Sequence, residues 1–258
     1  MADYIEIDTA KRMNGLRLVL TAGAPGAPWT EAAKAVFDVK AIPYARVAQR
    51  TGSTDAALRD WTGHPNAPIA MYENERARAG WLEILHLAER LAPAPRLIPA
   101  DARDRVLMFG LANELNSEDG LVWCRRLMMF DQAASTTGAP LGGFVALRGR
   151  DYGYVPEDAR RAPQRVLEVL QLFADQLRVQ RALDRRFLVG DALSAVDLYW
   201  ATMSAIVSPL PHEQCPMPKG LRAAYEGSPE SIRTAIDPAL IEHRDFIYRT
   251  YLTLPVDT

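Results

Sequence analysis

The residues best suited to chemistry in the first third of the chain are a hydroxyl and an indole at the expected start of a helix. Thr30 and Trp29 follow a run rich in glycine and proline, residues 22–28, and precede apolar residues at helical spacing. Thr30 can cap a helix over 31–39, or its hydroxyl can hydrogen-bond an anion held there. The helix N-terminus adds free amides and a positive dipole end, which also stabilise an anion. Trp29 can line such a site or be buried against the rest of the protein.

A thiol is the second candidate for chemistry. Cys124, between Trp123 and Arg125, is either a reactive cysteine beside positive charge or a small buried hydrophobic residue. The histidines are scattered and lack the spacing of a zinc site: His64, His86, His212 and His243. The segment 23–26 lacks the GxGxxG pattern that follows a dinucleotide-binding strand. The sequence therefore predicts no metal centre and no nucleotide cofactor.

Composition limits the partners of the chain. Its 258 residues carry 30 Lys and Arg against 32 Asp and Glu, so a net charge of -2 disfavours nucleic acid. Two cysteines are too few for a disulfide framework and indicate a reducing compartment. The N-terminal segment is acidic where a secretory signal is basic, and no apolar run reaches the roughly 18 residues of a membrane helix. We expect a cytoplasmic protein without a membrane partner.

The elements that must position Thr30 alternate between strands and helices. Apolar residues recur with period two in strands and at three- or four-residue spacing in helices. These periods predict strands at 16–21, 42–47 and 69–72, and helices at 31–39, 54–61 and 81–91. The order βαβαβ followed by a helix indicates a small α/β sheet domain.

The second half of the chain has a different pattern. Three prolines in the segment 92–101 favour an extended connector rather than a helix. Beyond it the strand signal disappears and helical apolar stripes continue to the C-terminal region. We therefore predict an α/β domain over 1–92, a linker over 93–103 and an all-helical domain over 104–258.

Several motifs, in a consistent order, give this two-domain arrangement a family resemblance. Ser194 and Asp197 have the spacing of a capping box that opens a helix, with Leu193 and Leu198 placed for a hydrophobic staple. Ala67-Pro68 precedes the third predicted strand, where an X-Pro bond can be cis. Together with the linker 97–101, these motifs resemble the glutathione transferase superfamily over about residues 16–208. The resemblance implies a thioredoxin-like N-terminal domain followed by a helical-bundle C-terminal domain.

The resemblance also implies where glutathione would bind. The backbone of Ala67, before Pro68, is expected to hold the cysteinyl part of the tripeptide. The family's Glu-Ser pair, which binds the γ-glutamyl group, falls on Arg78-Ala79 or on Ala79-Gly80, so the serine is missing. Backbone amides at that helix start, a charge from Arg76 or Arg78 and the carboxylate of Glu75 are possible replacements. These charged residues are otherwise a solvated surface turn.

The sulfur-activating residue of the family is also replaced. Positions that carry Cys or Ser in several classes hold Ala27 and Pro28, which disfavours a mixed-disulfide mechanism. Thr30 is the hydroxyl at the helix start and Thr21 the one at the strand end, so Thr30 is our candidate catalytic residue, assisted by Trp29 as a glutathione contact.

The resemblance places the second substrate against the first helices of the helical domain. There the sequence offers a mostly apolar wall with one amide and one cation: Phe109, Asn113, Trp123, Arg126, Met129 and Phe130. Of these we select Phe109, Trp123 and Arg126 as the electrophile pocket. The predicted function is a homodimeric glutathione transferase acting on a small hydrophobic electrophile. A non-catalytic binding or interaction protein of the same fold and a disulfide reductase using Cys124 are the alternatives.

Overall fold

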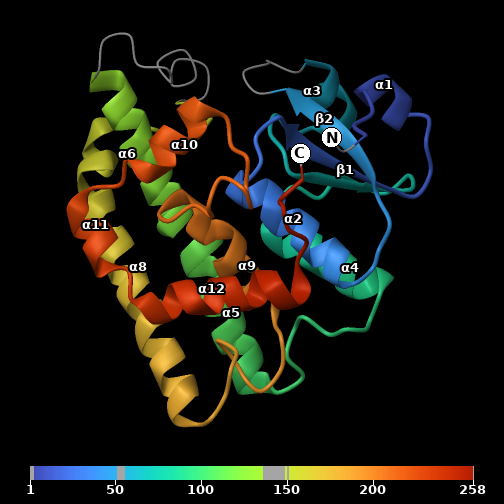
Figure 1. Cartoon of the computed structure of the whole chain (residues 1–258). Helices are drawn as coiled ribbons and strands as arrows, with labels where there is room; N and C mark the ends of the chain where they lie inside the picture. The colour runs from blue at the N-terminus through green and yellow to red at the C-terminus, as the bar shows by residue number, and fades with distance from the viewer. Residues whose placement is uncertain (1–2, 51–55, 136–148, 150, 258) are drawn as a thin grey trace.

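A three-stranded sheet forms the centre of the N-terminal unit in the computed structural model, which describes residues 3–50, 56–135, 149 and 151–257 (Figure 1). Strand β1 (Leu16–Ala22) lies between β2 (Ala45–Arg50), which is parallel to it, and β3 (Ile69–Tyr72), which is antiparallel. Ile5 pairs with Val47 along the outer edge of β2, and Arg78 pairs with Ala70 along the outer edge of β3. Both sheet edges are therefore partly covered, which protects their backbone groups from pairing with another chain.

Helices pack on both faces of this sheet because its buried side chains alternate along β1. Leu18 and Leu20 belong to the apolar cluster shared with α2 (Pro28–Val39) and α4 (Trp81–Leu91). Val19 faces the opposite way, in a cluster with α1 (Ile7–Ala10) and α3 (Ala56–Thr62). The predicted α/β unit is confirmed, and the third strand and the helix after the cis-proline segment have the bounds expected from the sequence.

Two predicted elements begin at other residues than expected. The second strand covers Ala45–Arg50 rather than 42–47, because Pro43 has no amide to donate to the sheet and lies in the irregular segment before the strand. Helix α2 begins at Pro28, with Ala27 as its N-cap and no side-chain capping bond. Thr30 is thus the third residue of α2 and not its cap. Pro28 starts the helix instead, since the first helical position needs no amide hydrogen.

The second unit is all helical. Its elements are α5 (Ala102–Asn116), α6 (Leu121–Ser135), α8 (Pro156–Ala182), α9 (Ala195–Met203), the short 3₁₀ helix η1 (Ser204–Ile206), α10 (Lys219–Glu226), α11 (Glu230–Ala235) and α12 (Pro238–Tyr251). Asp101 caps α5 by accepting hydrogen bonds from two amides, those of Arg103 and Asp104. The fold class predicted from the sequence, a thioredoxin-like sheet unit followed by helices, is confirmed.

The predicted capping box at the start of α9 is part of a larger buried network. The carboxylate of Asp197, which has no solvent exposure, accepts hydrogen bonds from Ser194 N at 2.9 Å and from Ser194 Oγ at 2.8 Å. It also accepts one from Leu188 N at 2.8 Å and lies 3.0 Å from His243 Nε2 of α12. One carboxylate thus ties α9 to the preceding loop and to the last helix, which satisfies the hydrogen-bonding capacity of a buried charge.

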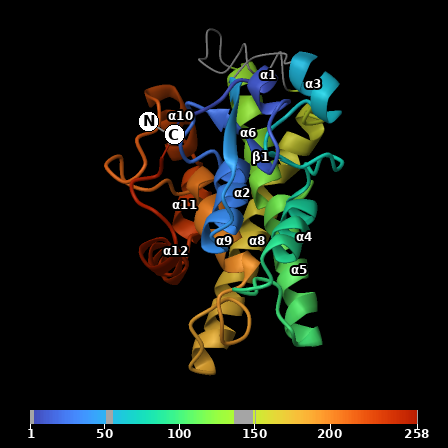
Figure 2. The ribbon, with the colours of Figure 1, turned by 90° about the vertical axis from the view of Figure 1, so that its right-hand side faces the viewer.

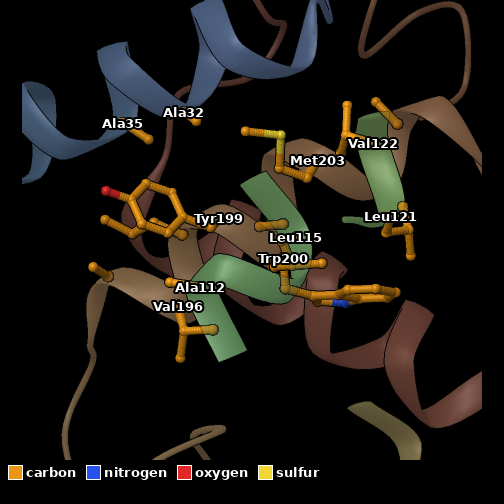
Figure 3. Close-up of a cluster of buried hydrophobic side chains, with 14 of the residues drawn as sticks. Ala32, Ala35, Ala112, Leu115, Leu121, Val122, Val196, Tyr199, Trp200 and Met203 are labelled. Atoms are coloured by element: carbon orange, nitrogen blue, oxygen red, sulfur yellow. The ribbon is translucent and has the colours of Figure 1, made fainter. Parts of the chain in front are cut away.

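Both units contribute to one apolar core, in which α9 lies against α2 (Figure 2). Figure 3 shows Tyr199 and Met203 of α9 facing Ala32 and Ala35 of α2. Small residues on α2 allow this close approach, so the orientation of α2 relative to the helical unit is fixed by packing.

The loop before α2 also packs on the helical unit. Gly26 has φ +76°, and a Cβ placed there would lie 2.3 Å from Met217 Cε and 2.9 Å from Cys215 Sγ. At the C-terminal end, Asp257 bonds Lys34 of α2 and Arg46 of β2, each at 2.5 Å. The N-terminus of α2 is therefore positioned by contacts from both units.

Candidate active site

Three predicted glutathione contacts converge around the bond between Ala67 and Pro68, which is cis as the sequence suggested. Pro68, Trp29 and Ala79 line one small cavity at the junction of the two units, together with residues of α2, α4, α5 and α9. Its volume is about 20 Å³. Sites for small molecules usually measure about 300–1,000 Å³, so a tripeptide would have to lie along the outside of this junction.

The backbone amide of Ala67 already has a partner. Gln49, at the end of β2, accepts a hydrogen bond from Ala67 N at 2.7 Å through Oε1. Its Nε2 donates to Pro65 O at 2.7 Å, and the side chain is nearly completely buried. Gln49 therefore occupies the donor that the family resemblance assigns to the ligand. Sequence reasoning missed this residue, because its partners lie 16 and 18 positions away.

Thr30 forms a hydroxyl pair with Thr21 at the end of β1. Its Oγ1 lies 3.3 Å from Thr21 Oγ1 and accepts a hydrogen bond from Thr21 N at 3.2 Å. Thr30 is buried, whereas Thr21 is only half-buried. Of the two hydroxyls, that of Thr21 is the more accessible, so the pair can donate a hydrogen outward through Thr21 while Thr30 holds it in place.

The N-terminus of α4 provides a second anion-attracting feature. Gly80 is the N-cap, so the missing serine of the family motif corresponds to a residue with no side chain. Glu83 lies near the Gly80 amide at 3.5 Å and pairs with Arg76 at 2.6 Å. The first amides of α4 remain without partners inside the helix, as in any helix. Trp81 and Ile84, in its first turn, line the same cavity as Pro68.

Glu75 and Arg78, which precede that helix start, are engaged in ion pairs. Glu75 pairs with Arg78 at 2.5 Å and with Arg90 at 2.6 Å, and Arg90 lies in the last turn of α4. Hydrogen bonds from Arg90 and Arg78 hold the pKa of Glu75 below its usual range. Through Glu75, the ion pairs thus link Arg78, two residues before the N-cap, to Arg90 in the last turn of α4.

The predicted electrophile residues separate into two places. Trp123 of α6 lies with its ring centroid 5.3 Å from that of Tyr152, and Trp29 lies 6.2 Å from the same tyrosine. The Arg126 guanidinium is 5.6 Å from the centre of the Trp29 ring and 5.8 Å from that of Tyr152. Phe109 instead packs against His86 of α4, with 5.9 Å between the two ring centroids.

Tyr152 is the site residue that sequence analysis missed in this region. It belongs to no helix, so it carries no periodic signal, but an aromatic pair at positions 152 and 154 in a glycine-containing loop is a weak indication. Its ring contacts Trp29 of α2 and Trp123 of α6. We call Trp29, Trp123, Tyr152 and Arg126 the aromatic cluster.

The cysteines are protonated at neutral pH. Burial, reinforced by the charge of Asp119, raises the pKa of Cys124 to about 12. Burial raises the pKa of Cys215 to about 11. A thiol must ionise to act as a nucleophile, so neither environment activates its sulfur.

Comparison with known proteins by sequence gives no result: no family model and no curated protein matches the chain. Comparison by structure does. A glutathione S-transferase from Methylobacterium radiotolerans, in complex with glutathione sulfonate, matches with a TM-score of 0.65 and 15% identity over 92% of both chains. A glutathione S-transferase domain-containing protein from Marinobacter aquaeolei matches with a TM-score of 0.63 and 14% identity, over 92% of this chain and 100% of that one. The Tau class glutathione S-transferase of mango matches with a TM-score of 0.54 and 16% identity, over 91% of this chain and 98% of that one.

The chain has the glutathione transferase fold. Within this fold the structure brings together Trp29, Ala79 and Pro68 at the junction, and places Arg126 over Trp29 and Trp123 beside Tyr152. Glu75 and Arg78 pair with each other, and Phe109 lies against His86.

Among the described residues, no group of three or more His, Cys, Asp or Glu side chains is arranged to hold a metal ion. None of the helices in that part of the chain combines the length and apolar character needed to cross a membrane.

Proposed function

We propose that the protein is a glutathione transferase that joins glutathione to a small aromatic electrophile. The observation that carries the proposal is the convergence of the cis Ala67-Pro68 segment and the N-termini of α2 and α4 on one junction, beside the aromatic cluster. The similar protein from Methylobacterium radiotolerans, which was solved with glutathione sulfonate, supports a glutathione ligand.

In this proposal, glutathione lies along the outside of the junction. The γ-glutamyl carboxylate takes the free amides at the start of α4, with Arg76 adding positive charge. The cysteinyl backbone bonds Ala67 once the Gln49 side chain rotates away from its amide. Glu75 and Arg78 are given no part in binding, because Glu75 already pairs with both Arg78 and Arg90.

Sulfur activation is assigned to the N-terminus of α2. The Thr21 hydroxyl, held by Thr30 at 3.3 Å, donates a hydrogen bond to the glutathione sulfur, and the α2 dipole favours the thiolate further. Thr30 then acts as a positioning residue for Thr21. Both effects lower the pKa of the bound thiol, which increases the fraction of nucleophile at neutral pH.

A binding protein without catalysis is the second candidate. It is favoured by the contact between Gln49 and Ala67, which occupies one expected ligand donor, and by the absence of Cys or Ser at Ala27 and Pro28. Both candidates bind glutathione at the same junction. They differ only in whether the bound glutathione is transferred to a second substrate.

Calorimetry with glutathione, followed by a turnover assay with 1-chloro-2,4-dinitrobenzene, separates these candidates. Binding with turnover supports the transferase. Binding without turnover, repeated with several electrophile classes, supports the second candidate. No binding at millimolar glutathione contradicts both.

A homodimer is part of the proposal. Apolar side chains are exposed on α4 and α5, two helices that contact each other through His86 and Phe109: Leu82 at 40%, Val106 at 72% and Leu107 at 40%. Exposed apolar residues gathered on neighbouring helices favour burial against a second copy. Light scattering is expected to give twice the chain mass, and Val106→Glu is expected to shift the protein to monomer. A monomeric wild type at working concentration contradicts this part.

A further inference from the structure

The aromatic cluster contains a cation whose partners among the described residues are uncharged. Arg126 lies over the rings of Trp29 and Tyr152 and close to Tyr225. Its Nε atom is buried and has no hydrogen-bond partner. A buried donor without an acceptor costs free energy unless something supplies one. The residue as a whole is half-buried, so part of its surface remains accessible to a ligand.

A second guanidinium next to it is equally uncompensated. Arg125 is buried and donates to Ser228 Oγ and to Ala224 O, both at 3.0 Å. Burial and the neighbouring charge of Arg126 lower the pKa of Arg125 to about 10. Within the described part of the chain, no carboxylate forms an ion pair with either arginine. Residues 136–148, which follow α6, contain no Asp or Glu in their sequence either.

Adjacent positive charges without a counter-ion create a local field that attracts an anion. The flat rings of Trp29, Trp123 and Tyr152 add surfaces on which an aromatic ring can stack. We infer that the second-substrate site of this protein selects an aromatic anion, with Arg126 binding the carboxylate or sulfonate and the aromatic cluster holding the ring. Use of the anion as a substrate rests on the proposed function, whereas binding of the anion does not.

Glutathione itself carries carboxylates, so it is a second possible source of the anion. Arg126 contacts Trp29, the second residue of α2, and lies on the side of the helical unit. The first amides of α4 and the segment at Ala67 are already assigned to glutathione, which leaves Arg126 for the other substrate. Measuring both ligands separately distinguishes the two sources.

The reaction expected for such a substrate is an aromatic substitution. With 4-chloro-3-nitrobenzoate, the thiolate sulfur attacks the ring carbon that carries chlorine, and a carbon–sulfur bond forms. The carbon–chlorine bond then breaks, and chloride leaves with its electron pair. The thiol proton has passed to solvent before the attack. No oxidant or reductant is required, and the benzoate group is unchanged.

Wild-type protein supplies the first test, without any variant. Binding of 4-nitrobenzoate and of the neutral 4-nitrobenzamide is measured by calorimetry in the absence of glutathione. We expect the anion to bind about 10-fold more tightly, as for one charge-assisted hydrogen bond, and to lose this advantage at high salt. Equal binding of the two compounds overturns the inference, whatever the result for glutathione turnover.

Substitutions at Arg126 supply the second test. Arg126→Gln is expected to abolish the preference for the anion, Arg126→Lys to retain part of it, and Arg160→Gln, at an exposed position of α8, to leave it unchanged. Glutathione affinity should be the same in all four proteins. A preference that persists in folded Arg126→Gln overturns the inference, and so does a loss confined to glutathione binding. If Arg126→Gln does not fold, the salt dependence of the wild type decides.

The two proposals fail separately. If 4-nitrobenzoate binds through Arg126 but glutathione does not bind, the anion site stands and the transferase function fails. If glutathione binds and 4-chloro-3-nitrobenzoate and its neutral amide, 4-chloro-3-nitrobenzamide, are turned over with equal kcat/KM, the transferase stands and the anion selectivity fails.

Discussion

The side-chain oxygen of Gln49 lies 2.7 Å from the backbone nitrogen of Ala67, immediately before the cis-proline. This contact gives the buried amide a partner in the free protein and links β2 to the segment that leads into β3. It also means that a ligand using the Ala67 amide must first displace the glutamine. The strength of glutathione binding therefore depends on a side chain that does not resemble a binding residue in the sequence.

Removal of this side chain should strengthen glutathione binding. A net hydrogen bond contributes about 0.5–1.5 kcal/mol, so Gln49→Ala is expected to lower the Kd about 2- to 10-fold. The free protein should be less stable by a similar amount, because the amide loses its partner. Calorimetry and thermal unfolding measure the two effects, with Gln171→Ala on the surface of α8 as a control. A weaker affinity in Gln49→Ala would mean that the glutamine contacts glutathione directly.

The hydroxyl pair of Thr21 and Thr30 should control the pH dependence of turnover. If the pair stabilises the bound thiolate, Thr30→Ala raises the thiol pKa and shifts the rise of kcat/KM to higher pH, with a loss of about 10-fold or more below it. Thr30→Ser keeps the hydroxyl and should restore the wild-type profile. An unshifted profile in a folded Thr30→Ala protein assigns activation to the backbone amides of α2.

Gly26 should be intolerant of a side chain for two reasons that can be measured separately. Gly26→Ala combines a positive φ with a clash against Cys215 and Met217, and should cost about 2–4 kcal/mol of unfolding free energy. Gly23→Ala has a similar φ of +73° but no heavy atom within 4 Å, and should cost only about 1 kcal/mol. Equal losses in urea titrations would show that the contact between the loop and the helical unit adds nothing.

Asp257 should make stability depend on pH. Burial opposes its ionisation, but the hydrogen bond and charge of Lys34, together with Arg46, outweigh burial and hold the pKa of Asp257 below 3.8. The folded state thus binds this proton less readily than the unfolded chain. The stabilisation is present above the unfolded pKa and is lost as the pH falls through the folded one. Because the carboxylate is partly exposed, solvent screening limits its contribution to about 1 kcal/mol.

Asp257→Asn is the variant that checks this dependence. Its unfolding free energy should lie below that of the wild type near neutral pH, and the two curves should converge in acid. Asp191→Asn, whose carboxylate is 77% exposed in a pair with Arg185, serves as the control. A constant difference between Asp257→Asn and wild type from neutral pH to pH 3 would contradict the assignment.

Cys124 should have no part in turnover. Its pKa of about 12 keeps the thiol protonated at neutral pH, so Cys124→Ser is expected to keep the wild-type kcat/KM. Alkylation by iodoacetamide should be slow at neutral pH and accelerate as the pH rises. Loss of activity in a folded Cys124→Ser protein would return the disulfide reductase to consideration.

The sequence predicted the elements of the sheet unit because each carries its own period and its own proline or glycine boundary. It missed the start of α2, since Ala27 and Pro28 contain no side-chain cap to mark it. The strong cap of α9 was correctly predicted, because Ser194 and Asp197 are three residues apart and interact locally.

The site was less predictable than the fold. The cis bond at Pro68, which the family resemblance implied, is present in the structure. The partners of Glu75 and Phe109 lie on α4, at Arg90 and His86, and periodicity does not predict such contacts. Gln49 and Tyr152 acquire their contacts from residues distant in sequence, so only the folded chain brings them to the site.

Calorimetric titration of the wild-type protein with glutathione, with Gln49→Ala in parallel, tests the central claim most directly. The account predicts saturable binding of one glutathione per chain, and a lower Kd in Gln49→Ala. Absence of binding to both proteins at millimolar glutathione would contradict it, because the junction at Ala67 would then hold no tripeptide even when its amide is free.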